Sequence, residues 1–330
     1  MATTLDSAPR ARDRKRGVPI TGRTPRRRQD RRRRVAAYGF LAPFMLLFAG
    51  LFFFPIGYAL YTSLYRQTFD GLGFGGSELK FVGLSSYVTV FTTPDFYNGV
   101  FRLLEFGVVV VPLILGVAIL LALMLDSRLA FMKRLFRAAF VLPYTVPGVI
   151  AALLWGFLYQ PGLSPITSAT EGLGLGTVDL VGSDLVLGSI GNIMVWAGVG
   201  FNMLIIYAAL QSIPASIVEA ARVDGAGEIR IALRIKLPIV LPAVVMTGLF
   251  TIIGTLQLFN EPVILSKISN AISSSYTPNM MAYNAAYGNN DEPLSAAISV
   301  SLAMIAFVLS FGFLRLTARA SGLSAPKETK

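Results

Sequence analysis

The residues of this sequence that could do chemistry lie mainly in one charged, glycine-punctuated segment, Ile213 to Leu241, within an otherwise apolar chain. This segment carries a carboxylate at Glu219 and an Asp-Gly-Ala triplet that begins at Asp224. The sequence contains no histidine and no cysteine, which excludes thiolate nucleophiles, histidine bases and His/Cys metal sites. The chemistry left to Glu219 is recognition, in which a carboxylate accepts charge-assisted hydrogen bonds from a neighbouring protein.

Local signals in this segment predict two short helices that meet at a glycine. Pro214 suits the first turn of a helix, where its missing N–H costs nothing, and Ser212 can cap the free N–H groups. Gly225 can adopt the left-handed conformation that ends a helix. A second helix is expected over Glu228 to Leu237, ending before Pro238.

The fixed residues of this segment are Glu219-Ala220-Ala221, then Asp224-Gly225-Ala226, then Ile235-x-Leu237-Pro238. This pattern resembles the EAA loop of ABC importer permeases of the carbohydrate-uptake type. The resemblance implies that residues 213–238 form a cytoplasmic coupling loop that docks into a cleft of an ATP-hydrolysing subunit, with Glu219 as the acidic residue. Family members commonly carry bulky aromatics where this chain has Ile229, Ala232 and Leu233. The alternative is an amphipathic loop that lies on lipid headgroups.

Composition places the chain among integral membrane proteins. Of its 330 residues, 54% are hydrophobic and only 14% are charged, which is outside the range of an ordinary soluble domain. Of the 29 basic residues, 13 lie before position 35. Residues 1–35 are therefore interpreted as a disordered basic cytoplasmic tail that rests on anionic lipid. Nucleic-acid binding is not expected, because the rest of the chain is close to neutral.

Six apolar segments follow the tail, and each is long enough to cross a bilayer core, which takes about 20 helical residues. They are expected at Ala36 to Leu64, Gly99 to Leu125, Ala138 to Tyr159, Val186 to Gln211, Ile239 to Glu261 and Ala296 to Leu316. The sequence thus predicts an all-α membrane domain over residues 36–320 and a cytoplasmic tail at 321–330. The outer connections 66–98 and 160–185 are glycine-rich and are interpreted as flexible or solvated loops.

Charge placement predicts the orientation of these segments. With the N-terminal tail in the cytoplasm, 12 of the 16 basic residues beyond it fall in inner segments, as the positive-inside rule requires. The outer segments hold only Arg66, Lys80, Arg102 and Lys267. Both termini and the Glu219 segment are therefore expected in the cytoplasm.

The third apolar segment contains two prolines, Pro143 and Pro147, followed by Gly148. Backbone groups that proline leaves unpaired in a membrane helix need protein or water as partners. We interpret this segment either as a moving element or as a static kink.

Polar residues within or beside the fourth and fifth segments are the candidates for a solute path, because amides and carboxylates are costly in hydrocarbon. Gln257, Asn260 and Glu261 have the spacing of a shared helix face. Amides and carboxylates bind sugar hydroxyls and tyrosine rings stack on sugars, whereas hydrogen bonding between helices or an interfacial tyrosine belt are the alternatives. The candidate residues are Asn202, Tyr207, Gln257, Asn260, Glu261, Tyr283 and Asn284.

The resemblance implies the six-helix fold of a type I ABC importer permease, in a bacterial cell membrane. It also implies a second homologous permease, two ATP-binding subunits and an extracytoplasmic solute-binding protein. The sequence has no Walker A motif, so ATP and Mg are expected on the ATP-binding partner, and no enzyme activity, cofactor or metal is expected in this chain. The expected function is sugar import, of a di- or oligosaccharide, by alternating access. An ion-coupled secondary carrier for a small polar solute is the alternative.

Overall fold

The computed structural model describes residues 26–69, 77–128, 130–160, 162–174 and 176–318. The predicted tail at 321–330, the glycines at 71–76 and most of the basic tail lie outside the described residues. The chain forms two compact units, Met1–Ile56 and Gly57–Lys330. The first contains α1 (Arg26–Phe48) and a π-helical turn, η1 (Ala49–Phe53), and the unit boundary falls inside α2 (Phe54–Thr62).

Helix α1 begins at Arg26, inside the stretch that was expected to be disordered. Arginine and glutamine are good helix formers, so a helix that starts in the apolar segment can extend back into the basic run. The apolar part of the first helical segment is Ala36–Thr62, close to the predicted Ala36 to Leu64.

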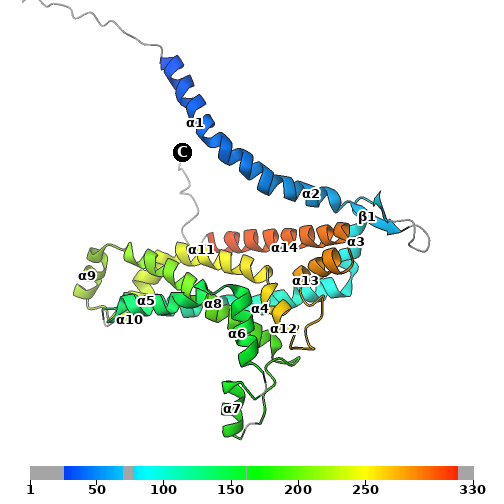
Figure 1. Cartoon of the computed structure of the whole chain (residues 1–330). Coiled ribbons are helices and arrows are strands. Elements are labelled where there is room, and N and C mark those ends of the chain that lie inside the picture. The colour runs from blue at the N-terminus through cyan, green and yellow to red at the C-terminus, as the bar shows by residue number, and fades with distance from the viewer. Residues whose placement is uncertain (1–25, 70–76, 129, 161, 175, 319–330) are drawn as a thin grey trace, which may run out of the picture. The chain divides into compact units, whose positions relative to one another are not determined.

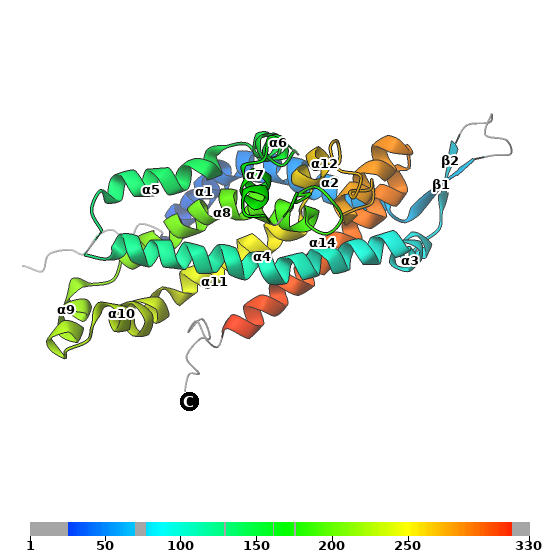
Figure 2. The ribbon, with the colours of Figure 1, turned by 90° about the horizontal axis from the view of Figure 1, so that it is seen from below.

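The second unit is built on three helices that pack on one another. They are α4 (Pro94–Asp126), α8 (Val186–Gln211) and α11 (Leu237–Leu256). Figures 1 and 2 show them running alongside one another, with α14 (Glu292–Ala318) against α11. Fully buried Leu103, Ile114, Met203 and Ile206 form part of the core between these helices. Gly198 meets the Ile114 side chain, because small residues let membrane helices approach closely.

Five helices of the described residues are long and apolar enough to cross a membrane, and a sixth crossing results if one bent pair counts as a single span. The bent pair is the third predicted segment, so the six-segment prediction is met only with this bend. The other spans also overlap their predictions. The fourth, Val186–Gln211, coincides with its prediction, whereas α4 begins five residues early, at Pro94.

The third segment is not one helix over Ala138 to Tyr159. It consists of α5 (Lys133–Val141), a 3₁₀ turn, η2 (Leu142–Thr145), and α6 (Gly148–Leu158), with a bend of 94°. Val146 is extended, since the residue before a proline is pushed out of the helical region, and Pro147 then caps α6. The α-helix therefore ends just before Pro143 and restarts just after Pro147.

The fifth segment is also broken. Helix α11 ends at Leu256, and α12 (Asn260–Leu265) starts after a short non-helical stretch. A continuous helix would set the ring of Pro262 against the carbonyl of Leu258, so the chain leaves the helix there and places Pro262 in the first turn of α12. The prediction that Gln257, Asn260 and Glu261 share one helix face is therefore wrong.

The outer connections hold more regular structure than the sequence suggested. Strands β1 (Tyr65–Phe69) and β2 (Ser77–Phe81) form an antiparallel hairpin, with Arg66 opposite Lys80, and α3 (Ser85–Thr92) follows. This hairpin is a small departure from the all-α prediction. Farther along lie α13 (Pro278–Tyr283) and the π-helical η4 (Asn284–Gly288).

Segment 160–185 is likewise anchored. It contains α7 (Pro165–Gly172), which Ser164 caps by accepting a hydrogen bond from the N–H of Thr167. Two hydroxyls from other parts of the chain donate to its carbonyls: Ser189 to Leu180 at 2.6 Å and Ser269 to Val181 at 2.5 Å. These contacts fix the backbone of the segment at Leu180 and Val181, although its glycines had indicated a flexible connection.

Candidate functional site

The segment predicted as a coupling loop forms two helices around a glycine turn, as expected. Helix α9 (Ala215–Val223) is followed by Asp224 and then by Gly225, whose φ is 79°. The N–H of Ala226 donates to the carbonyl of Ala221 at 2.9 Å, which is the closing bond of a Schellman motif. The predicted left-handed conformation of Gly225 is confirmed.

The first and last predicted helix boundaries in this loop are wrong, whereas the second helix begins at Glu228 as predicted. The Ser212 hydroxyl donates to the carbonyl of Ala209 instead of capping α9, and Pro214 itself occupies the cap position. The second helix does not end before Pro238: α10 (Glu228–Ile231) continues through a π-helical turn, η3 (Ala232–Lys236), into α11. The wider π turn accommodates the proline, whose ring would otherwise meet the carbonyl of Arg234. Leu237 and Pro238 thus open α11.

The loop exposes a carboxylate beside aliphatic side chains. Glu219 and Ala220 are exposed, whereas Ala221 is buried. Val223 is 88% exposed and Ile229 77%, so both side chains present apolar surface. Figures 1 and 2 place α9 and α10 at the end of the second unit opposite α3 and α13. The loop is therefore a projecting surface that combines charge with apolar contact area.

Arg222 and Glu228 join the two halves of the loop. The Nη2 and Nε of Arg222 lie 2.8 and 3.0 Å from one carboxylate oxygen of Glu228, across the turn at Gly225. Asp224 is exposed at the C-terminal end of α9. Within the described part of the chain, Glu219 has no such ion-pair partner, so its carboxylate is free to accept hydrogen bonds from another molecule.

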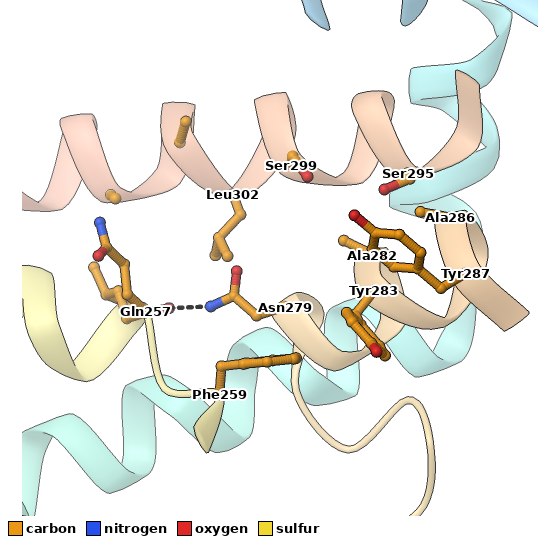
Figure 3. Close-up of a pocket in the computed structure, with 13 residues that line it drawn as sticks. Gln257, Phe259, Asn279, Ala282, Tyr283, Ala286, Tyr287, Ser295, Ser299 and Leu302 are labelled. Atoms are coloured by element: carbon orange, nitrogen blue, oxygen red, sulfur yellow. Dashed lines mark hydrogen bonds between the residues drawn. The ribbon is translucent and has the colours of Figure 1, made fainter. Parts of the chain in front are cut away.

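At the other end of the second unit, a pocket of about 560 Å³ opens between the end of α11, α13 and α14. Figure 3 shows the side chains that line it, and Asn279 donates to the carbonyl of Leu256 at 3.3 Å. None of its lining residues is charged. The polar groups of the pocket are the amides of Gln257 and Asn279, the phenols of Tyr283 and Tyr287 and the hydroxyls of Ser295 and Ser299.

Three aromatic rings form a row along one side of this pocket. The Phe259 and Tyr283 centroids lie 5.3 Å apart, and those of Tyr283 and Tyr287 lie 4.8 Å apart. Both tyrosines are more than half exposed, so their faces are accessible to a ligand. The break after α11 places Phe259 in this row.

Gln257 and Tyr283 are the two sequence candidates that the structure brings together in the pocket. Asn202 instead accepts a hydrogen bond from Thr251 and donates to the carbonyl of Gly198, so it links α8 to α11 as the helix-pairing alternative described. Tyr207 lies under the guanidinium of Arg137, 6.0 Å from it. Asn284 folds over the turn at Gly288 and does not line the pocket.

Asn260 and Glu261 lie at a second place, where the two broken helices meet. Helix α12 packs on α6, and a Cβ built on Gly148 would lie 3.7 Å from the Asn260 amide nitrogen and 3.5 Å from a Glu261 carboxylate oxygen. Non-helical backbone at membrane depth is tolerated only where protein or a water-filled cavity supplies partners. The adjoining breaks therefore mark this place as a second polar part of the bundle.

The candidate residues chosen from the sequence did not include Asn279 and Tyr287, although both lie in the same aromatic, amide-rich stretch as Tyr283, and sequence reasoning missed Ser295 and Ser299. The two serines lie in the predicted sixth span or just before it, four residues apart. This spacing places them on one helix face, which was a usable signal. Phe259 carried no signal, because its position depends on the break in the helix.

Comparison with known proteins gives a consistent result. Residues 114–320 match the family described as binding-protein-dependent transport system inner membrane component. The sn-glycerol-3-phosphate transport system permease protein UgpA of Yersinia pseudotuberculosis is 36% identical over 205 residues, which cover 62% of this chain and 68% of that protein. UgpA of Escherichia coli O6:K15:H31 is 31% identical over 282 residues, covering 84% of this chain and 92% of the relative.

Among solved structures, a chain of a bacterial alginate ABC transporter in complex with an alginate pentasaccharide-bound periplasmic protein superposes with a TM-score of 0.74. The match covers 89% of this chain and 97% of that chain, at 19% identity. At this identity the likeness shows the fold.

Proposed function

We infer the function from one premise: this chain belongs to the family of binding-protein-dependent transport system inner membrane components. It is a multi-pass membrane subunit with the type I importer permease fold. We propose that it forms the translocation path of an ATP-driven sugar importer, together with a second homologous permease. The comparisons favour this function over an ion-coupled carrier.

We propose that the loop 213–238 docks an ATP-binding subunit on the cytoplasmic side. Glu219 would accept charge-assisted hydrogen bonds there, while Val223 and Ile229 would enter an apolar part of the partner's cleft. The aliphatic side chains replace the bulky aromatics common in the family and still provide apolar area for burial. ATP and Mg belong to the docked partner, and two such subunits serve the permease pair.

The observation that carries the sugar assignment is the row of rings formed by Phe259, Tyr283 and Tyr287 beside the amides of Gln257 and Asn279. Aromatic faces stack on the apolar faces of a sugar ring, and amides exchange hydrogen bonds with its hydroxyls. The relatives are named for sn-glycerol-3-phosphate and for alginate, both polyhydroxylated solutes. Asn260 and Glu261 extend the polar path toward α6.

Transport would proceed by alternating access without chemistry on the solute. A binding protein delivers the solute at the outer end, and closure of the ATP-binding pair displaces the coupling loops and reorients the helices. The bend between α5 and α6 and the break between α11 and α12 adjoin each other, so one movement can alter both. Hydrolysis then returns the complex to the inward-open state, from which the solute leaves into the cytoplasm.

Uptake by the assembled importer in proteoliposomes tests this function, with a panel of radiolabelled mono-, di- and oligosaccharides. We expect ATP-dependent uptake, and Tyr283→Ala should raise the KM by about 2- to 12-fold, the equivalent of roughly 0.5–1.5 kcal/mol of ring stacking. Tyr97→Ala is the matched control, because Tyr97 is also exposed but does not line the pocket. Uptake driven by an ion gradient without ATP would contradict the proposal.

A further inference from the structure

Asp126, the last residue of α4, holds both ends of the coupling loop. Gln211, the last residue of α8, donates its amide N–H to Oδ1 of Asp126 at 2.7 Å. Lys236, directly before α11, forms an ion pair with Oδ2 of the same carboxylate. The chain leaves the helix bundle after Gln211 and re-enters it at Lys236. The Asp126 side chain therefore contacts both points, at the end of α8 and at the start of α11, and ties them together.

The ion pair of this tie is shielded from solvent, whereas Gln211 is exposed. The Lys236 and Asp126 side chains are 12% and 11% exposed, compared with 23% and 47% for Arg222 and Glu228 within the loop. Water screens an exposed pair, which then contributes little, whereas removal of one partner from a shielded pair leaves an uncompensated charge. The Asp126 contact therefore resists opening more strongly than the pair inside the loop.

The two ends of the loop are attached to the bundle differently. On one side, α10 continues through η3 into α11, so the second half of the loop and α11 form one continuous helical segment. On the other side, only Ser212 to Pro214 separate α8 from α9. A push on the loop would reach α11 directly but could be absorbed at this short connection before it reached α8.

We propose that Asp126 is a positioning residue that transmits movement of the loop to α4 and α8. Its carboxylate fixes the start of α11 to the ends of both other helices, which pack on each other and on α11 along their length. Displacement of the loop then moves the three helices together. The transmission step rests on the proposed docking of an ATP-binding subunit, whereas the tie itself is a property of this chain.

The cysteine-free sequence allows two spin labels to be placed cleanly, one at Ser216→Cys on α9 and one at Leu120→Cys on α4, both exposed positions. Pulsed EPR on the full-length subunit in nanodiscs, alone and in the assembled importer with ATP and vanadate, reports the distance between loop and helix. In the native chain we expect a narrow distribution of distances between the two labels. This distribution should stay the same when the importer is trapped with ATP and vanadate.

Asp126→Asn should broaden this distribution, because an NH2 group, which only donates, replaces one of the two carboxylate oxygens that accept from Gln211 and Lys236. In the trapped importer the loop should then move without α4. The double variant Asp126→Asn with Lys236→Gln should restore the narrow distribution, since the asparagine amide can donate to the new glutamine while its oxygen still accepts from Gln211. Arg128→Gln, a neutralised exposed cation two residues from Asp126, is the matched control.

The proposal is overturned if Asp126→Asn leaves both distributions as in the native chain, or if Arg128→Gln broadens them equally. It is also overturned if the double variant has the melting temperature of the native subunit but its distance distribution remains broad. If no ATP-binding subunit joins the native chain, the proposed function fails while the measurement on the subunit alone still decides whether Asp126 ties the loop.

Discussion

Gly225→Ala should weaken binding of the ATP-binding subunit through backbone strain alone. The glycine has φ 79°, and a Cβ added there would meet nothing within 4 Å, so no steric clash contributes. A left-handed conformation costs an L-residue about 1–2 kcal/mol. The exposed loop can relax from this strain when free and must restore the turn when docked, which predicts a roughly 5- to 30-fold loss of affinity.

Two further glycine-site variants separate strain from other effects. Gly227→Ala is the matched control, because Gly227 also meets nothing within 4 Å but has φ −72°, which alanine adopts freely. Gly225→Asn should retain more affinity than alanine, since asparagine tolerates the left-handed region. The assay is a titration of labelled ATP-binding subunit onto the permease in nanodiscs. Equal affinities for the two alanine variants would refute this reasoning.

Three other outcomes are expected. Glu219→Gln should lower the affinity for the ATP-binding subunit by about ten-fold or more, which corresponds to the loss of one charge-assisted hydrogen bond. Unchanged recovery of the ATP-binding subunit in a pull-down would contradict the docking role of Glu219. Gly200→Ala should destabilise the subunit by about 1–3 kcal/mol or more, because the new Cβ would lie 2.0 Å from a main-chain oxygen, whereas Gly188→Ala, with nothing within 4 Å, should leave the melting temperature unchanged. A cysteine at Gly172 should react with an impermeant thiol reagent in intact cells and one at Ser216 should not, and the reverse labelling would invert the proposed topology.

The sequence was most informative where one local signal decides the structure. Val186 to Gln211 was predicted with both ends correct, since polar or turn-forming residues flank a single apolar run. Gly225 was predicted to take a positive φ because Asp-Gly after a helix has few other conformations. The exposed position of Glu219 followed from its place in a charged loop.

The breaks inside apolar segments were the features that sequence reasoning misplaced. Residues 239–261 form a nearly unbroken apolar run, and periodicity cannot reveal a helix that ends at Leu256. Pro262 was the available signal, because proline excludes a helical bond to the residue four positions earlier. The same rule at Pro147 indicated the bend after α5, although its size of 94° depends on packing against α8 and α12.

The other features that the sequence did not predict depend on contacts between residues that are far apart in the chain. Asp126 and Lys236 are 110 positions apart, and nothing local to either residue reveals the other. Asn202 had the pattern expected of a solute ligand, but in the structure its amide oxygen accepts a hydrogen bond from Thr251 of a neighbouring helix. The sequence was compatible with either role. The three-ring row likewise requires Phe259, in the break before α12, to lie beside the distant α13 and η4.

The contact at Gly200 has a mechanical consequence. Here α8 meets the main chain at Phe140, at the end of α5, with no side chain between them, since even a methyl group would overlap the Phe140 carbonyl. Interlocked side chains must change rotamers when two helices slide, whereas a bare backbone surface has none to change. At Gly200 itself, movement of the bent segment over α8 therefore needs no rotamer change, whereas the stacked rings of Tyr144 and Phe201 beside it, 4.7 Å apart, would have to shift.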